Sequence, residues 1–262
     1  MLIGKSSLQL FLIICLNCAL FSACGNQSSN SKHFKDFPSK VLWAWERPEN
    51  LEFLDAKNYG VAFLAQTLIL EDESVKFRPR RQILKVAPET KLIAVTRIES
   101  QKVSGKAAAM SDEQRAQIVK LILKTLEFKG VSAIQIDFDA IVSEREFYRR
   151  ILIDLRQKMP ANMALSMTAL ASFCVGDRWL ENLPIDEAVP MLFRMGADNE
   201  KIKNYLAGGN DFATPLCRTS YGIATDEPIA AKLDSARRLY VFKAQAQPWT
   251  PADVETIEQL NR

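Results

Sequence analysis

The sequence predicts a single-domain (β/α)₈ barrel over residues 40–262. Eight short β-rich runs alternate there with helical or loop segments, which is the pattern of a parallel sheet closed into a barrel. Hydrophobic residues make up 48% of the 262 residues, enough to bury a large core. A doubly wound open sheet is the competing interpretation. Such a sheet usually has a glycine-rich turn after its first strand, and none follows the first run here.

The predicted strands span residues 41–45, 60–64, 92–96, 133–137, 164–168, 188–192, 220–223 and 239–242. Each run is four or five residues long, and most of the residues in these runs are apolar, as expected for strands covered on both faces. The segment 67–78, around Glu71-Asp72-Glu73, is expected to form a hairpin outside this alternation.

Three helices have clear start signals. The run Ser-Asp-Glu-Gln at 111–114 has the pattern of a capping box, and Gly130 is placed to stop the chain after that helix. Ser143 is expected to open a second helix, which Pro160 ends. Thr250 followed by proline predicts the start of a last helix.

The N-terminus predicts export. Residues 1–23 contain one early positive charge, Lys5, and an apolar run that is too short for a membrane span, which indicates a signal peptide. The run Phe21-Ser22-Ala23-Cys24-Gly25 resembles a bacterial lipobox, and this resemblance implies lipidation at Cys24. Ordinary secretion is the alternative. Because Gly25 rather than an aspartate follows the cysteine, the resemblance favours the outer membrane in a cell that has one.

Residues 24–39 are rich in Ser, Asn and Gln and are expected to form a flexible linker. The only histidine, His33, falls in this linker, where an ordinary solvated side chain is expected. A folded domain without histidine excludes a His-based triad and the usual zinc and non-haem iron sites, so no metal is expected.

Charge and glycine content exclude two further classes. The net charge is +3 with no block of like charges, which argues against nucleic-acid binding. The chain has ten glycines and no phosphate-cradling glycine-rich loop, so no nucleotide cofactor is expected.

The candidate catalytic residues lie on the fourth strand, in the run Ile134-Gln135-Ile136-Asp137-Phe138-Asp139. Alternate residues of a strand share a face, so Ile134, Ile136 and Phe138 should face the helices. Asp137 and Asp139 then share the polar face at the C-terminal end of the strand, where barrel active sites lie, roughly 7 Å apart along the strand. Two nearby carboxylates push their pKa values apart, as glycoside cleavage requires. A hydrogen-bonded pair that orders the following loops is the structural alternative.

Aromatic and polar residues near other strand ends favour a carbohydrate ligand, because flat aromatic rings stack on the apolar faces of sugars. The candidate substrate-binding residues are Trp45, Glu46, Arg97, Gln135, Ser166, Thr168, Met191, Arg194, Tyr221 and Trp249.

Three of these segments resemble a known bacterial family, domain of unknown function 3142. They are the strand-four run, Leu165-Ser166-Met167-Thr168-Ala169-Leu170, and Pro190-Met191-Leu192-Phe193-Arg194-Met195. The resemblance implies a fold but no established activity. More distantly, strand four is similar to that of family 18 chitinases, in which three carboxylates at alternate positions end in a glutamate acid. Gln135, Asp137 and Asp139 stand at those positions, so the first is not acidic and the last is one methylene shorter.

Two of the five cysteines, Cys174 and Cys217, lie in the predicted barrel of an exported protein, where a disulfide can form. Cys174 follows strand five and Cys217 precedes strand seven. We therefore expect the two cysteines near opposite ends of the barrel and too far apart to bridge, unless the segment 196–215 folds back.

Two functional hypotheses follow. In the first, the protein is a glycoside hydrolase-like enzyme with Asp139 as general acid and Asp137 as its partner. In the second, the barrel binds a glycan or a partner protein at the cell envelope without catalysis. The oligomeric state is left open by the sequence.

Overall fold

The computed structural model describes residues 32–262, except 103–104, 228, 230, 244–246 and 261–262. The predicted signal peptide and the lipobox Cys24 lie outside the described residues. In the described part of the chain, none of the helices is both long enough and apolar enough to cross a membrane.

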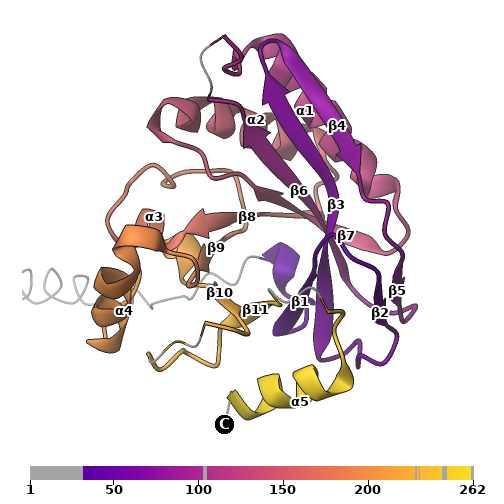
Figure 1. Ribbon diagram of the computed structural model, residues 1–262, viewed down its shortest axis with the longest axis vertical. Helices are drawn as coiled ribbons and strands as arrows, with labels where there is room; N and C mark the ends of the chain where they lie inside the picture. Colours follow the sequence, from indigo (N-terminus) through magenta and orange to yellow (C-terminus); the bar gives the residue numbers. More distant parts are fainter. Residues whose placement is uncertain (1–31, 103–104, 228, 230, 244–246, 261–262) are drawn as a thin grey trace, which may run out of the picture.

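Eight parallel strands close into a barrel, as the sequence predicts (Figure 1). The hydrogen-bonded order is β1-β11-β10-β9-β8-β7-β6-β3, and β3 also pairs with β1 to close the ring. The barrel strands are β1 (Lys40–Ala44), β3 (Tyr59–Glu71), β6 (Leu92–Ser100), β7 (Val131–Asp137), β8 (Ala164–Leu170), β9 (Glu187–Met191), β10 (Ser220–Ala224) and β11 (Arg238–Phe242). Each contains most or all of one predicted strand.

The expected hairpin is also present. Strand β3 continues beyond the barrel and pairs antiparallel with β4 (Ser74–Pro79), with the turn at residues 72–73. A separate two-stranded sheet, β2 (Glu49–Leu51) with β5 (Leu84–Val86), lies beside the barrel.

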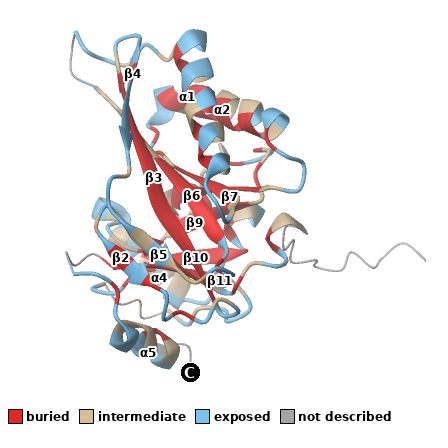
Figure 2. Ribbon diagram, turned by 90° about the vertical axis from the view of Figure 1, so that its right-hand side faces the viewer, coloured by how far each residue is buried: buried red, intermediate tan, exposed pale blue. Residues whose placement is uncertain are grey.

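Helices cover the outside of the barrel unevenly (Figures 1 and 2). Helices α1 and α2 contact each other, and their buried residues pack against the outward-facing strand residues. The α-helices are α1 (Asp112–Lys124), α2 (Arg145–Lys158), α3 (Ala171–Val175), α4 (Asn199–Ala207) and α5 (Pro251–Leu260). Short 3-10 turns occur at η1 (Lys32–Phe34), η2 (Thr125–Glu127), η3 (Val142–Glu144), η4 (Gly196–Asp198) and η5 (Pro215–Cys217).

The start signal of α1 is confirmed. The Ser111 hydroxyl accepts a hydrogen bond from the Gln114 N–H at 3.2 Å. Gly130 has φ +85° and turns the chain into β7, as its placement predicts.

The expected Ser143 cap of α2 is wrong. A 3-10 turn precedes that helix, and the Glu144 carboxylate accepts a hydrogen bond from the Ile141 N–H at 2.8 Å. Ser143 thus lies inside the turn, and the side chain of the following acid hydrogen-bonds back to the start of that turn.

Two hydrophobic clusters lie on the two faces of the closed sheet. The inner cluster fills the barrel and includes Val41, Trp43, Ile93 and Tyr240. The larger outer cluster joins the strands to the helices and includes Ile134, Ile136 and Phe138, as strand alternation predicts. Figure 2 shows the barrel strands largely buried, with α1 and α2 beside them carrying both buried and exposed residues.

The N-terminal segment differs from the expected linker, and the prediction of a solvated His33 is wrong. Phe34 is 3% exposed and belongs to the cluster inside the barrel. His33 is partly buried, and its Nδ1 lies 2.6 Å from an oxygen of Asp186, the residue before β9. The ordered fold therefore starts before Lys40, and its histidine lies at the N-terminal ends of the strands.

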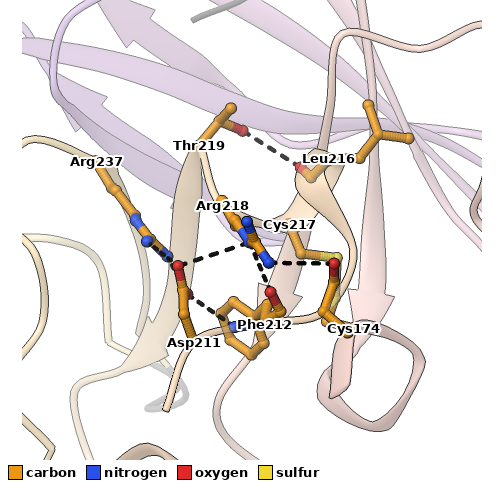
Figure 3. The surroundings of a disulfide bond; sticks show 9 residues. Cys174, Asp211, Phe212, Leu216, Cys217, Arg218, Thr219 and Arg237 are labelled. Atoms are coloured by element: carbon orange, nitrogen blue, oxygen red, sulfur yellow. Dashed lines mark hydrogen bonds and ion pairs between the residues drawn. A yellow bond between two sulfur atoms is a disulfide. The ribbon is translucent and has the colours of Figure 1, made fainter. Parts of the chain in front are cut away.

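The structure also corrects the cysteine geometry (Figure 3). Cys174 and Cys217 form a disulfide, with their Cα atoms 5.9 Å apart. The segment after α4 does fold back, because the N–H groups of Ala213 and Thr214 both donate to the Cys174 carbonyl. This return brings η5 against α3 on the outside of the barrel, so the expected separation does not occur.

Candidate active site

A cavity of about 270 Å³ opens at the C-terminal ends of the barrel strands. One wall is mainly polar and comes from β6, β7 and β8. The opposite wall is mainly aromatic and comes from β1, β11 and the end of β9. The lining residues are Trp43, Trp45, Val95, Arg97, Asp137, Asp139, Thr168, Leu170, Met191, Phe193, Arg194 and Phe242.

The two predicted catalytic residues both line this cavity. Asp137 is the last residue of β7, and Asp139 follows in the loop to η3. The intervening Phe138 is buried in the outer cluster and packs on Tyr148 with ring centroids 5.2 Å apart. Strand alternation therefore directs the two carboxylates to the cavity, because the apolar residue between them is held by the helix layer.

Burial raises the pKa of Asp137 to about 6. The Thr168 hydroxyl donates to Asp137 Oδ1 at 2.7 Å and works in the opposite direction, because a hydrogen bond stabilises the charged form. The charge of Asp139 adds to the rise. Asp137 is consequently an acid that gains or loses its proton near neutral pH.

The pKa of Asp139 is raised as well, again chiefly by loss of water around the carboxyl group. The positive charges of Arg97 and Lys102 oppose this rise. Arg97 lies over the Trp45 ring at 5.7 Å, and its Nε is 2.9 Å from a Glu99 oxygen. The cavity thus holds two carboxyl groups with raised pKa values and one arginine that moderates both.

The floor of the cavity is a buried hydrogen-bonded layer. The Trp43 indole N–H donates to the Gln135 side-chain oxygen at 2.9 Å, and the Gln135 amide donates to the Ser166 hydroxyl at 3.2 Å. A side chain at Gly222 would place its Cβ 3.2 Å from the Trp43 ring, so the glycine leaves room for the indole. Gln135 and Ser166 therefore support the site from below and do not line it.

The aromatic wall is built from rings that hold one another. Phe193 and Phe242 stack at 5.5 Å with an interplanar angle of 2°, and Trp45 meets Phe242 edge-on at 5.8 Å. All three are partly exposed, which leaves ring surface open to a ligand. Each follows or ends a barrel strand, so the wall depends on strand register rather than on any local motif.

Arg194 lines the cavity with its guanidinium engaged elsewhere. Its Nη2 is 2.6 Å from Asp226 and its Nη1 is 3.0 Å from Glu227, both in the loop after β10. Its φ is +54°, an uncommon conformation for a residue other than glycine. These ion pairs tie the loop that carries Phe193 to the next loop around the barrel.

Five predicted substrate-binding residues lie outside the cavity lining: Gln135 and Ser166, described above, and Trp249, Tyr221 and Glu46. Trp249 is 3% exposed, and its indole N–H donates to the Trp43 carbonyl, so it packs behind β1. Tyr221 points out of the barrel because its neighbour Gly222 faces the interior, and Arg237 lies over its ring at 5.1 Å. Glu46 is exposed in the loop after β1.

Of the predicted binding residues, Trp45, Arg97, Thr168, Met191 and Arg194 do line the cavity. Sequence reasoning did not select Phe242, Val95 or Leu170 as binding residues. Their side chains are apolar, which is typical of core residues. Only their positions at the ends of strands indicate that they could contact a ligand. In the described residues, no group of three or more His, Cys, Asp or Glu side chains is placed to hold a metal ion.

Comparison with known proteins gives distant structural likenesses. No protein-family model matches the sequence, and no curated protein matches it, so the resemblance to domain of unknown function 3142 remains an expectation from its motifs. A family GH18 chitinase from Chromobacterium violaceum is similar, with a TM-score of 0.49, 11% identity and coverage of 79% of each chain. The Bacillus cereus spore cortex-lytic enzyme SleL is similar over 71% of this chain, with a TM-score of 0.45 and 13% identity. This chain covers 50% of the length of SleL. The barrel assignment itself rests on the strand pairing described above.

Proposed function

We propose that the protein is a glycoside hydrolase-like enzyme that binds a carbohydrate in the barrel cavity. The observation that carries this proposal is that two carboxyl groups with raised pKa values lie across the cavity from a wall of partly exposed aromatic rings. A sugar ring stacked on Trp45 and Phe242 would present its polar edge to Asp137 and Asp139.

In this mechanism, Asp139 is the general acid and protonates the oxygen of the leaving group. It lies in the loop beyond the strand and is the more exposed of the two carboxyls, so it is the one that a bound glycosidic oxygen can reach. Asp137, held by Thr168, is its carboxylate partner. It stabilises positive charge that develops on the sugar ring or activates the attacking water.

The test is hydrolysis of bacterial and environmental polysaccharides, measured as new reducing ends. Asp139→Asn should lower the rate by roughly 10²–10⁴-fold, because it removes general acid catalysis. Glu113→Gln, an exposed acid in the first turn of α1, is the matched control and should keep the wild-type rate. Full activity of Asp139→Asn would remove Asp139 from the mechanism.

A non-catalytic glycan-binding barrel is the second candidate, and Gln135 favours it. The side-chain amide is neutral and fully buried. Its oxygen accepts a hydrogen bond from Trp43, and its nitrogen donates one to Ser166. It therefore supplies no third acid to the site. This candidate predicts binding on a glycan array without turnover, and loss of binding in Trp45→Ala. Detectable hydrolysis would contradict it.

We also propose that the protein is exported and anchored to the bacterial envelope through a lipid on Cys24. The lipobox-like run and the short apolar segment before it support this location. Expressed in a bacterium, the wild-type protein should partition with membranes, and Cys24→Ser should release it to the soluble fraction. Equal partitioning of the two proteins would contradict the anchor.

A further inference from the structure

Four charged side chains line the cavity: the acids Asp137 and Asp139 and the arginines Arg97 and Arg194. Both arginines that line it are already paired: Arg97 with Glu99, and Arg194 with Asp226 and Glu227. Asp137 and Asp139 add two further carboxyl groups. Because both arginines are held by other acids, the two aspartates are the charged groups of the lining that remain for a ligand. The positive charge of Lys102 also acts on Asp139.

The two aspartates have no ion-pair partner in the described part of the chain. The side-chain hydrogen bond of Asp137 comes from the neutral Thr168 hydroxyl, and no cation of the described residues lies within 4.0 Å of either carboxylate. Elsewhere in the fold, the buried acid Glu187 is paired with Arg238 at 2.8 Å. The unpaired carboxylates thus offer their charge to a ligand.

The aromatic wall adds a second, independent preference. The face of a tryptophan or phenylalanine ring carries negative electrostatic potential and attracts cations within about 6 Å of its centroid. Trp45, Phe193 and Phe242 present partly exposed rings to the same cavity. Because the Arg97 guanidinium already lies over Trp45 at 5.7 Å, the rings left for a ligand cation are those of Phe193 and Phe242.

We propose that the ligand of this cavity is a carbohydrate that carries free, protonated amino groups, with an ammonium group placed between the aspartates and the aromatic wall. The inference rests on the proposed carbohydrate function and specifies its substrate class. An N-acetylated sugar has no charge to offer these carboxylates, and an acidic sugar is repelled by them.

The experiment compares three tetrasaccharides of equal length by isothermal titration calorimetry at pH 7. They are the β-1,4 oligomers of glucosamine, of N-acetylglucosamine and of glucose. The glucosamine oligomer should bind at least tenfold tighter than either of the others. Its affinity should fall several-fold between 0.05 and 0.5 M NaCl, because salt screens exposed charges.

Variants separate charge from shape. Asp139→Asn and Asp137→Asn should each reduce the preference for the glucosamine oligomer, since each removes one carboxylate and keeps the side-chain volume. Glu113→Gln removes an acid far along the chain on α1 and should keep the full preference. Circular dichroism of each variant checks that the barrel is folded.

The outcomes distinguish this inference from the function on which it rests. Tighter binding of the N-acetylated or the glucose oligomer would overturn the amino-sugar inference and leave a carbohydrate-binding barrel. If the glycan array and hydrolysis assays described above detect no sugar of any class, the proposed function fails and the inference fails with it.

Discussion

Asp137 combines a partly buried position with a neighbouring carboxylate, and both raise its pKa to about 6, from an ordinary value of 3.8. Between these two pH values the native protein binds more protons than the unfolded chain, so this group lowers stability as the pH rises. A shift of this size corresponds to at most about 3 kcal/mol, and solvent around the partly exposed side chain reduces it.

We therefore expect Asp137→Asn to be more stable than the wild type at pH 8, by about 1–2 kcal/mol, and equally stable near pH 4. The amide keeps an oxygen that can accept from Thr168, so that hydrogen bond survives the substitution. Urea unfolding at both pH values measures the difference. A stability difference that is the same at pH 4 and pH 8 would contradict a raised pKa.

Arg97 gives a second prediction at the scale of one residue. Its positive charge lowers the pKa values of both Asp137 and Asp139, so Arg97→Gln should raise them. If loss of the proton from this pair limits hydrolysis on the alkaline side, the variant should keep activity to higher pH than the wild type. The pH–rate profile is the measurement. Arg178→Gln, an exposed arginine paired with Glu181, serves as the control and should leave the profile unchanged.

At the scale of elements, the disulfide cross-links two short segments that backbone hydrogen bonds also bring together. It closes a loop with a sequence separation of 43 residues and ties α3 to η5 (Figure 3). Around it, the Arg218 guanidinium donates to the Phe212 carbonyl at 2.6 Å. The cross-link therefore fixes the excursion that contains α4 to the side of the barrel.

We expect the double variant Cys174→Ala/Cys217→Ala to lose about 2–4 kcal/mol of stability, the range typical for a loop of this length. Because neither cysteine lines the cavity, ligand binding at low temperature should persist. Urea unfolding of the oxidised wild type, the reduced wild type and the variant makes the comparison. Equal midpoints for the oxidised wild type and the variant would argue against a structural role.

At the scale of the whole molecule, the N-terminal segment contributes to the inside of the barrel. Phe34 enters the inner cluster, and Arg238 lies over its ring at 4.7 Å while donating to the Phe34 carbonyl at 2.8 Å. His33 adds its contact with Asp186, which also pairs with Arg156. This segment therefore holds the N-terminal end of the barrel, opposite the cavity.

Phe34→Ala should destabilise the protein by about 3 kcal/mol, as expected for removal of a buried aromatic ring. Phe77 on β4 is 49% exposed, so Phe77→Ala is the matched control and should cost well under 1 kcal/mol. Thermal unfolding monitored by circular dichroism measures both. If the two variants lose the same stability, the N-terminal segment is not part of the core.

The sequence alone determined the barrel and the position of its acidic pair. Strand periodicity and strand order depend on local patterns of apolar residues, and the alternation around Phe138 already placed Asp137 and Asp139 on one face. Only the tertiary structure decided which other residues meet them. Phe242 and Trp45 are far apart along the chain, and their contact depends on the closure of β11 onto β1. The same holds for the Cys174–Cys217 bridge and for His33 beside Asp186, because both depend on where a long segment returns, and local sequence does not encode that return.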